Sequence, residues 1–211
     1  MEELRTLYPD YDVLAHQDEW DDHTREVVNK RLGPFTYKIL SEREQELARA
    51  LAQEIVYDDR KEILDWVLAH IDQELEQDLG EGDRDPQAPP QKELIKEGLR
   101  ALDHWSREYY DRDFLELDGE ARREILAQIQ VGQLPATDRW NSTLQKALFK
   151  KVAGLVVDAY YSHPHVWSEI GFGGPAYPRG YVRVELGLAD PWEPLLADSA
   201  EKGGEDSDAP L

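Results

Sequence analysis

Apolar residues recur every three or four positions through most of the chain between residues 41 and 160. An α-helix turns once in 3.6 residues, so this spacing places the apolar side chains on one helical face. The pattern recurs in separate segments, with apolar positions at Leu47, Leu51 and Ile55; Ile63, Val67, Ile71 and Leu75; Ile95, Leu99, Leu102, Trp105 and Tyr109; Ile125, Leu126 and Ile129; and Trp140, Leu144, Leu148, Val152, Leu155 and Ala159. The sequence therefore predicts an all-α fold, a single compact domain of about five amphipathic helices.

Capping residues indicate where these helices begin and end. The tetrapeptide Ser41-Glu42-Arg43-Glu44 has the spacing of a capping box, and the third helix is expected from about Gln91 to Tyr110. Asp118 is placed to cap the fourth helix, and Thr137 or Asp138 to cap the fifth. Residues 80–90 are rich in Gly, Asp and Pro, which predicts a flexible surface loop between the second and third helices.

The two ends of the chain lack sustained helical periodicity. Residues 1–40 predict an irregular N-terminal arm with a short helix near Asp18–Leu32, ended by Gly33-Pro34. The expected organisation is an N-terminal arm at 1–40, a helical domain at 41–160, a C-terminal docking loop and arm at 161–197, and an acidic disordered tail at 198–211. Within the C-terminal arm, the alternation of apolar and charged residues at 182–186 predicts an extended segment.

Composition excludes several classes of function. The formal net charge of −21 repels phosphate backbones, so no nucleic-acid partner is expected. No apolar run approaches the roughly 18 residues that a membrane span needs. The absence of cysteine excludes disulfides, iron–sulfur ligation and a thiol nucleophile. The first residues show no export signal, which favours a cytoplasmic protein.

Residues 160–181, YYSHPHVWSEIGFGGPAYPRGY, concentrate aromatic residues, prolines and glycines in a stretch that does not predict one regular element. Two interpretations stand: a loop that folds back on its own helices, or a protein-binding surface with aromatic and arginine anchors. On the second interpretation the candidate partner-binding residues are Tyr160, Tyr161, His163, His165, Trp167, Phe172, Pro175, Tyr177, Arg179 and Tyr181.

Catalytic chemistry has little support in the sequence. His163 and His165, with Glu169 nearby, can begin a metal site, but the remaining ligands of a closed site are not evident from spacing. A stand-alone metal-dependent enzyme that uses these two histidines remains an alternative. There is no dinucleotide-binding glycine motif, Walker loop or nucleophile elbow, so we assign no catalytic, cofactor-binding or metal residue to this chain.

Three blocks near the end of the chain resemble the closing signature of the gluconate 2-dehydrogenase subunit 3 family. They are Tyr160-Tyr161-Ser162-x-Pro164, Trp167-x-Glu169-Ile170-Gly171, and Gly174-Pro175-x-Tyr177-Pro178-x-Gly180-Tyr181. Upstream, Glu97–Asp103 is similar to the family's glycine-leucine helix, and Phe114–Leu117 to the segment that follows it. The resemblance extends from about Ser41 to Pro194.

This resemblance implies an all-helical subunit, inactive alone, in a hetero-oligomer with a large flavoprotein of the glucose–methanol–choline (GMC) oxidoreductase type. In such a pair the large chain holds FAD and oxidises a sugar, polyol or sugar acid, and the small chain supports its folding, stability or export. Many relatives begin with a twin-arginine signal that this N-terminus lacks, so a cytoplasmic complex is expected ahead of a periplasmic one. A helical assembly factor for a partner without flavin remains a further alternative.

Overall fold

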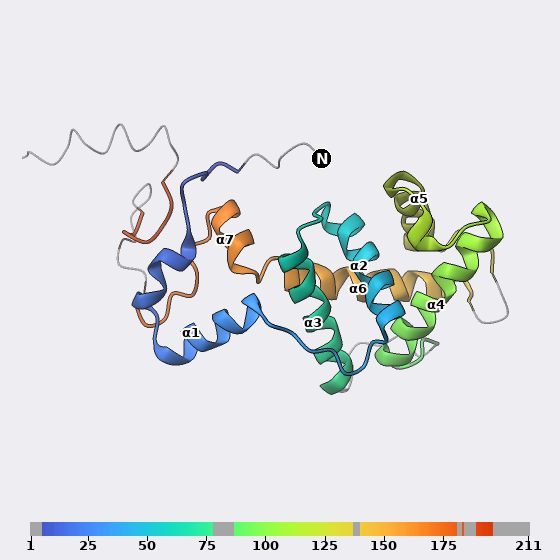
Figure 1. Ribbon diagram of the computed structural model, residues 1–211, viewed down its shortest axis with the longest axis horizontal. Coiled ribbons are helices and arrows are strands. Elements are labelled where there is room, and N and C mark those ends of the chain that lie inside the picture. The colour runs from blue at the N-terminus through green and yellow to red at the C-terminus, as the bar shows by residue number, and fades with distance from the viewer. Residues whose placement is uncertain (1–5, 78–86, 137–139, 181–182, 184–188, 196–211) are drawn as a thin grey trace, which may run out of the picture. The chain divides into compact units, whose positions relative to one another are not determined.

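The computed structural model describes residues 6–77, 87–136, 140–180, 183 and 189–195 (Figure 1). Every regular element among these residues is a helix, which confirms the all-α prediction. The α-helices are α1 (Asp22–Asn29), α2 (Glu42–Val56), α3 (Lys61–Gln77), α4 (Gln91–Tyr110), α5 (Gly119–Val131), α6 (Ser142–Tyr160) and α7 (Pro164–Ile170), and the 3-10 helices are η1 (Val13–Glu19), η2 (Lys30–Leu32) and η3 (Phe114–Glu116). No helix in the described ranges is both long enough and apolar enough to span a bilayer.

The chain forms two compact units. The helical unit comprises residues 34–160 and contains α2 to α6. The terminal unit combines residues 1–33 with residues 161–211, and its described elements are η1, α1, η2 and α7. The two ends of the chain, which sequence alone predicts as separate arms, thus belong to one unit.

Helix α6 is the centre of the helical unit. It packs against α2, α3, α4 and α5, and in Figure 1 it runs along the length of this unit. Its buried face includes Leu148, Val152 and Val156, which lie on the apolar side of the helix. Gly98 allows α4 to approach α6 closely, because a Cβ atom at this position would lie only 2.5 Å from the methyl carbons of Leu148.

Two of the expected N-terminal caps are confirmed. Ser41 and Glu44 form the predicted capping box, and the Asp118 carboxylate accepts a hydrogen bond from the Ala121 N–H. The predicted start of α6 is wrong in one respect: Trp140 precedes the helix, and the Asn141 side chain caps it by accepting from the Leu144 N–H. Trp140 is still buried, because its ring packs edge-on against Trp105 with the ring centroids 5.8 Å apart. An apolar residue at this position therefore did not mean that the residue belongs to the helix.

Several other predictions fall on residues outside the described ranges. Thr137 and Asp138, the predicted caps of the fifth helix, are among them, as are most of the predicted 80–90 loop and of the 182–186 extended segment. The acidic tail at 198–211 also lies outside the described residues.

A buried carboxylate joins residues 38–40 to the helical unit. Asp72 of α3 accepts hydrogen bonds from the backbone N–H groups of Lys38, Ile39 and Leu40 at 2.7, 2.9 and 2.8 Å. These bonds satisfy backbone donors that precede the first long helix. The helical unit therefore begins at Pro34, within the stretch expected as an N-terminal arm.

The terminal unit has a small core of its own, made by Val13, Trp20, Val28 and Trp167. Residues 164–170 form helix α7, a short regular element within the segment expected as a docking loop. Two local features explain this helix: Pro164 occupies its first turn, where proline is favoured, and Gly171 ends it with a φ of +74°. Figure 1 shows the N-terminal segment alongside α7, and Val13 N–H donates to the Ser168 hydroxyl at 3.1 Å.

Candidate protein-binding site

Tyr160, the first of the predicted partner-binding residues, is buried at the end of α6. Its phenol donates a hydrogen bond of 3.0 Å to the Asp58 carboxylate in the turn before α3, and Arg60 donates to the same carboxylate. Burial alone would raise the pKa of Asp58, but the hydrogen bonds from Arg60 and Tyr160 outweigh it and hold this pKa below its usual value. Tyr160 therefore has a structural contact inside the helical unit.

His163 and His165 have different surroundings. His163 is fully buried and caps α7, because its Nδ1 atom accepts the backbone N–H of His165 at 3.2 Å. The His165 side chain is exposed, with its ring edge-on to that of His163 at 4.9 Å. A metal ion bound to the Nδ1 atom of His163 would break this capping hydrogen bond. Across the described ranges, no three His, Asp or Glu side chains are grouped as metal ligands.

Trp167 lies in the core of the terminal unit with only 6% of its surface exposed. Its indole N–H donates to the Tyr161 carbonyl at 2.6 Å, and the Phe172 ring packs edge-on against it at 5.2 Å. The Arg31 guanidinium stacks over the same indole at 5.1 Å and donates to the Ser162 carbonyl at 2.7 Å. Burial lowers the pKa of Arg31. Trp167 thus makes contacts inside the terminal unit with Tyr161, Phe172 and Arg31.

Arg179 folds the loop that follows α7. Its guanidinium donates to the carbonyls of Gly173 and Pro175 at 2.7 and 3.2 Å and stacks over the Trp192 ring at 4.6 Å. It also pairs with Glu19 at 3.2 Å. All three of these oxygen partners lie in the terminal unit, so Arg179 stabilises the unit itself. Pro175, one of the predicted partner-binding residues, is half-buried.

Tyr11 strengthens the same part of the terminal unit. Its hydroxyl donates to the Trp192 carbonyl at 2.8 Å, which ties the N-terminal segment to residues near the C-terminal end. Burial raises the pKa of Tyr11 to about 12, although the charge of Arg179 opposes this shift. The phenol therefore stays protonated and able to donate at neutral pH.

The remaining predicted residues of the terminal unit are exposed. Tyr161, Phe172 and Tyr177 are 52%, 41% and 71% exposed, whereas Tyr181 is outside the described residues. Further exposed apolar side chains of this unit were not predicted, and they are Leu7 at 68%, Leu195 at 57%, Ile170 at 50%, Leu32 at 40% and Val27 at 38%. Ile170 lies in the aromatic segment, but its exposure follows from its place as the last residue of α7, a helix that the sequence did not predict. No sequence signal marks Leu7.

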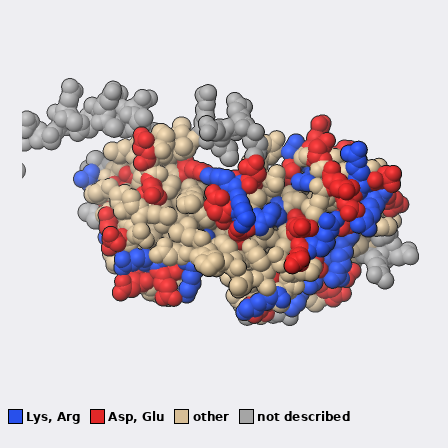
Figure 2. Space-filling model, in the orientation of Figure 1, with Lys and Arg blue, Asp and Glu red and all other residues tan. Residues whose placement is uncertain are grey.

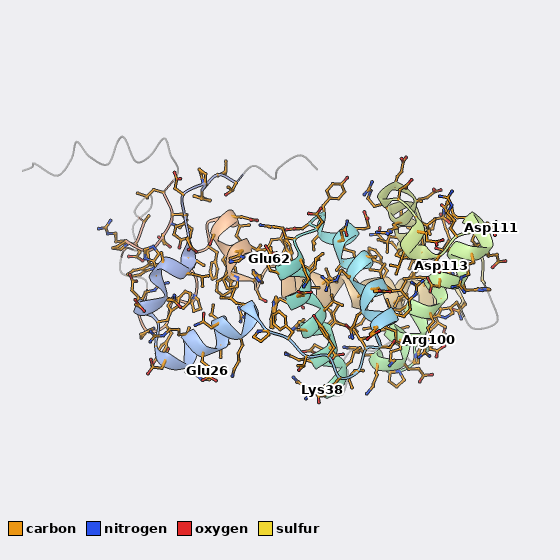
Figure 3. The ribbon with its side chains drawn as sticks, viewed as in Figure 1. Glu26, Lys38, Glu62, Arg100, Asp111 and Asp113 are labelled. Atoms are coloured by element: carbon orange, nitrogen blue, oxygen red, sulfur yellow. The ribbon has the colours of Figure 1, made fainter. Side chains whose placement is uncertain are left out.

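The helical unit has a polar cavity of about 340 Å³ between α2 and α4. It is lined by Ser41, Arg43, Glu44, Leu47, Arg100, Asp103, His104 and Arg107. Figure 3 labels Arg100, and also Asp113, which lies beyond the end of α4. Each arginine pairs with a carboxylate: Arg43 with Asp103, Arg100 with Glu44 and Glu97, and Arg107 with Asp113.

The Arg43–Asp103 and Arg100–Glu44 pairs tie α2 to α4, and the four pairs together largely neutralise the cavity. Burial alone would raise the pKa of Glu44, but hydrogen bonds from Ser41 and Lys96 outweigh it and lower this pKa. Figure 2 shows the same intermixing of acidic and basic side chains over the visible face of the helical unit. The cavity is therefore best explained as a structural ion-pair network.

The described residues of the three signature blocks thus lie at the end of α6, along α7 and in the loop that Arg179 folds. A comparison with known protein families matches residues 42–174 to gluconate 2-dehydrogenase subunit 3. The chain belongs to this family. No curated protein and no solved structure matches the chain.

Membership confirms the resemblance drawn from the sequence and makes this subunit 3 protein a component of a multi-subunit dehydrogenase complex. The match extends from α2 to α7 and ends at Gly174. It includes the exposed Tyr161, Ile170 and Phe172, whereas Tyr177 lies beyond it.

Proposed function

We propose that this protein is a non-catalytic small subunit that binds and stabilises, or helps to mature, a large FAD-dependent oxidoreductase of the GMC type. The large partner acts on a sugar, a polyol or a sugar acid. The observation that carries the proposal is the family match, which extends through α7 into a segment with exposed apolar side chains at Ile170 and Phe172. Exposed apolar residues that lie close together are typical of protein-binding surfaces.

The proposal assigns the redox chemistry to the partner. Hydride transfer from a sugar to flavin requires a site that holds FAD against the substrate, and this chain contributes no glycine-rich dinucleotide motif to such a site. Two charged groups of this chain, Asp58 and Arg179, are engaged in contacts that hold its own helices and loops. The small subunit acts by binding, and FAD belongs to the large chain.

Co-expression with a large GMC-type flavoprotein encoded beside it tests the proposal. We expect a soluble yellow complex with a flavin absorbance spectrum and sugar dehydrogenase activity, and little active large chain when it is expressed alone. Two chains that purify separately, with the large chain equally active in either case, would contradict the proposal. An active complex without flavin would contradict the choice of partner.

A further inference from the structure

We infer that the large subunit docks on one face of the terminal unit, and that its matching surface is apolar with a border of Lys and Arg. The face comprises Leu7, Tyr161, Ile170 and Phe172, and is called the α7 face below. The inference rests on the proposed function and names the surface through which it operates.

Contacts of neighbouring residues bring together the segments that carry the four residues of the α7 face. The Thr6 hydroxyl donates to the Glu169 carbonyl at 2.7 Å, which brings the neighbouring Leu7 alongside the end of α7. The Trp167 indole contacts both the Phe172 ring and the Tyr161 carbonyl, which brings these two residues close to the same helix. All these contacts lie within the terminal unit.

The backbone of the α7 face is held in place from within. Gly171 has a φ of +74°, and a Cβ atom there would lie 2.3 Å from the Tyr8 ring, so the N-terminal segment packs directly on the turn between Ile170 and Phe172. Below this turn, Trp167 is packed in the core of the unit. Anchors on a fixed backbone lose less conformational entropy on binding than anchors on a mobile loop.

Apolar exposure on the α7 face differs from that of the helical unit, and the terminal unit has further exposed apolar side chains at Val27, Leu32, Tyr177 and Leu195. In the helical unit the large exposed apolar side chains belong to different elements: Tyr57 follows α2, Tyr109 is on α4, Val131 on α5 and Val157 on α6. Single exposed apolar residues of this kind are ordinary, whereas a group is not. The α7 face is such a group, which favours it as the docking site.

The negative charge of this protein indicates which kind of partner binds the α7 face. Among the described residues of the terminal unit, acidic side chains outnumber basic ones, and the whole chain has a formal charge of −21. Three of its basic side chains, Arg25, Lys30 and Arg179, are paired with carboxylates of the same unit, and Arg31 stacks over the Trp167 ring. A second copy of this chain would bring like charge to the face, whereas a partner with Lys and Arg around an apolar patch would be attracted.

Paired charge-insertion variants of the full chain, each co-expressed with the large flavoprotein, test the inference. Ile170→Asp and Leu7→Asp insert a charge into the α7 face, and we expect each to weaken the complex at least tenfold. Val131→Asp is the matched control, because Val131 is 48% exposed and lies on α5, and we expect unchanged binding. The dissociation constant and the melting temperature are measured for each chain.

Ionic strength tests the charge component separately. Because oppositely charged surfaces steer association and salt screens this attraction, the association rate of the wild-type pair should fall as salt is raised. A rate that does not change with salt would overturn the basic border assigned to the partner. Ile170→Ser, which adds no charge, replaces Ile170→Asp if the latter lowers the melting temperature.

The outcomes separate the inference from the proposed function. If the wild-type complex forms and the α7-face variants bind as well as Val131→Asp, the docking face is wrong and the proposed function stands. If the wild-type chain forms no complex with the flavoprotein, the proposed function is wrong. If wild-type chains associate with one another and Ile170→Asp abolishes this, the occupant is a second copy and the inference is overturned.

Discussion

Tyr160 at the end of α6 donates a 3.0 Å hydrogen bond to Asp58, 102 positions earlier in the chain. The pair joins the C-terminal end of the central helix to the turn between α2 and α3. Trp66 of α3 supports the same junction, because its indole N–H donates to the Ala159 carbonyl at 3.0 Å. A residue that resembles a family signature thus closes the core of the helical unit.

Replacing Tyr160 by Phe should destabilise the helical unit by about 1.5–3 kcal/mol, the usual cost of losing a hydrogen bond to a charged group. Chemical denaturation of wild-type and variant proteins measures the difference. Tyr109→Phe is the control, because Tyr109 is 46% exposed and the loss of its hydroxyl should change stability little. Equal stabilities for wild type and Tyr160→Phe would show that the bond contributes nothing in solution.

Asp58 should make the stability of the protein depend on pH in the acid range. Its pKa is lowered in the folded state, so its contribution is complete above its unfolded pKa of about 3.9 and is lost as pH falls through the folded pKa. Asp58→Asn should lower stability at pH 7 and make the loss below about pH 4 less steep. Denaturation curves between pH 7 and pH 2.5 measure both effects. Parallel pH profiles for the two proteins would contradict the assignment.

Gly98→Ala should destabilise the contact between α4 and α6 despite the better helix propensity of alanine. The added Cβ would lie 2.5 Å from Leu148, and overpacking of this kind costs about 1–3 kcal/mol. Gly154→Ala is the matched control within α6, since no atom lies within 4 Å of the added Cβ, and it should stabilise by up to about 1 kcal/mol. Melting temperatures that shift in the same direction would refute the steric explanation.

Trp167→Ala should lower stability, and Tyr177→Ala should not. Trp167 is a core residue of the terminal unit, and truncating a buried tryptophan costs about 3–5 kcal/mol. Tyr177 is 71% exposed, so its replacement should stay within about 0.5 kcal/mol. Thermal unfolding distinguishes the two. A Trp167→Ala protein with normal stability and weakened association would restore Trp167 as a partner anchor.

The helices of the helical unit were predictable because their signals are local. Ser41 and Glu44 form the capping box that their spacing indicates, and α4 spans Gln91–Tyr110 as predicted. The start of α6 was less predictable, because a buried Trp140 looks the same in the sequence whether it lies on the helix or ahead of it. Short helix α7 was missed, because seven residues show too little periodicity to reveal a helix.

The candidate site was only partly predictable. The aromatic segment was found from its composition, but composition does not separate residues that pack inside the protein from residues that stay exposed. Tyr160, His163, Trp167 and Arg179 are engaged inside the protein, whereas Tyr161 and Phe172 are exposed. Exposure is decided by which other segments pack on a residue, so spacing along the chain does not report it.

Helical periodicity, caps and the signature blocks are written in neighbouring residues, and they are sufficient to establish an all-α chain of this family. Other features depend on contacts between residues far apart in the chain. Thr6 meets Glu169, and Val13 meets Ser168, only because the two ends fold into one unit. That association buries Trp167 and leaves Ile170 exposed, because burial is a property of packing between distant segments rather than of any local pattern.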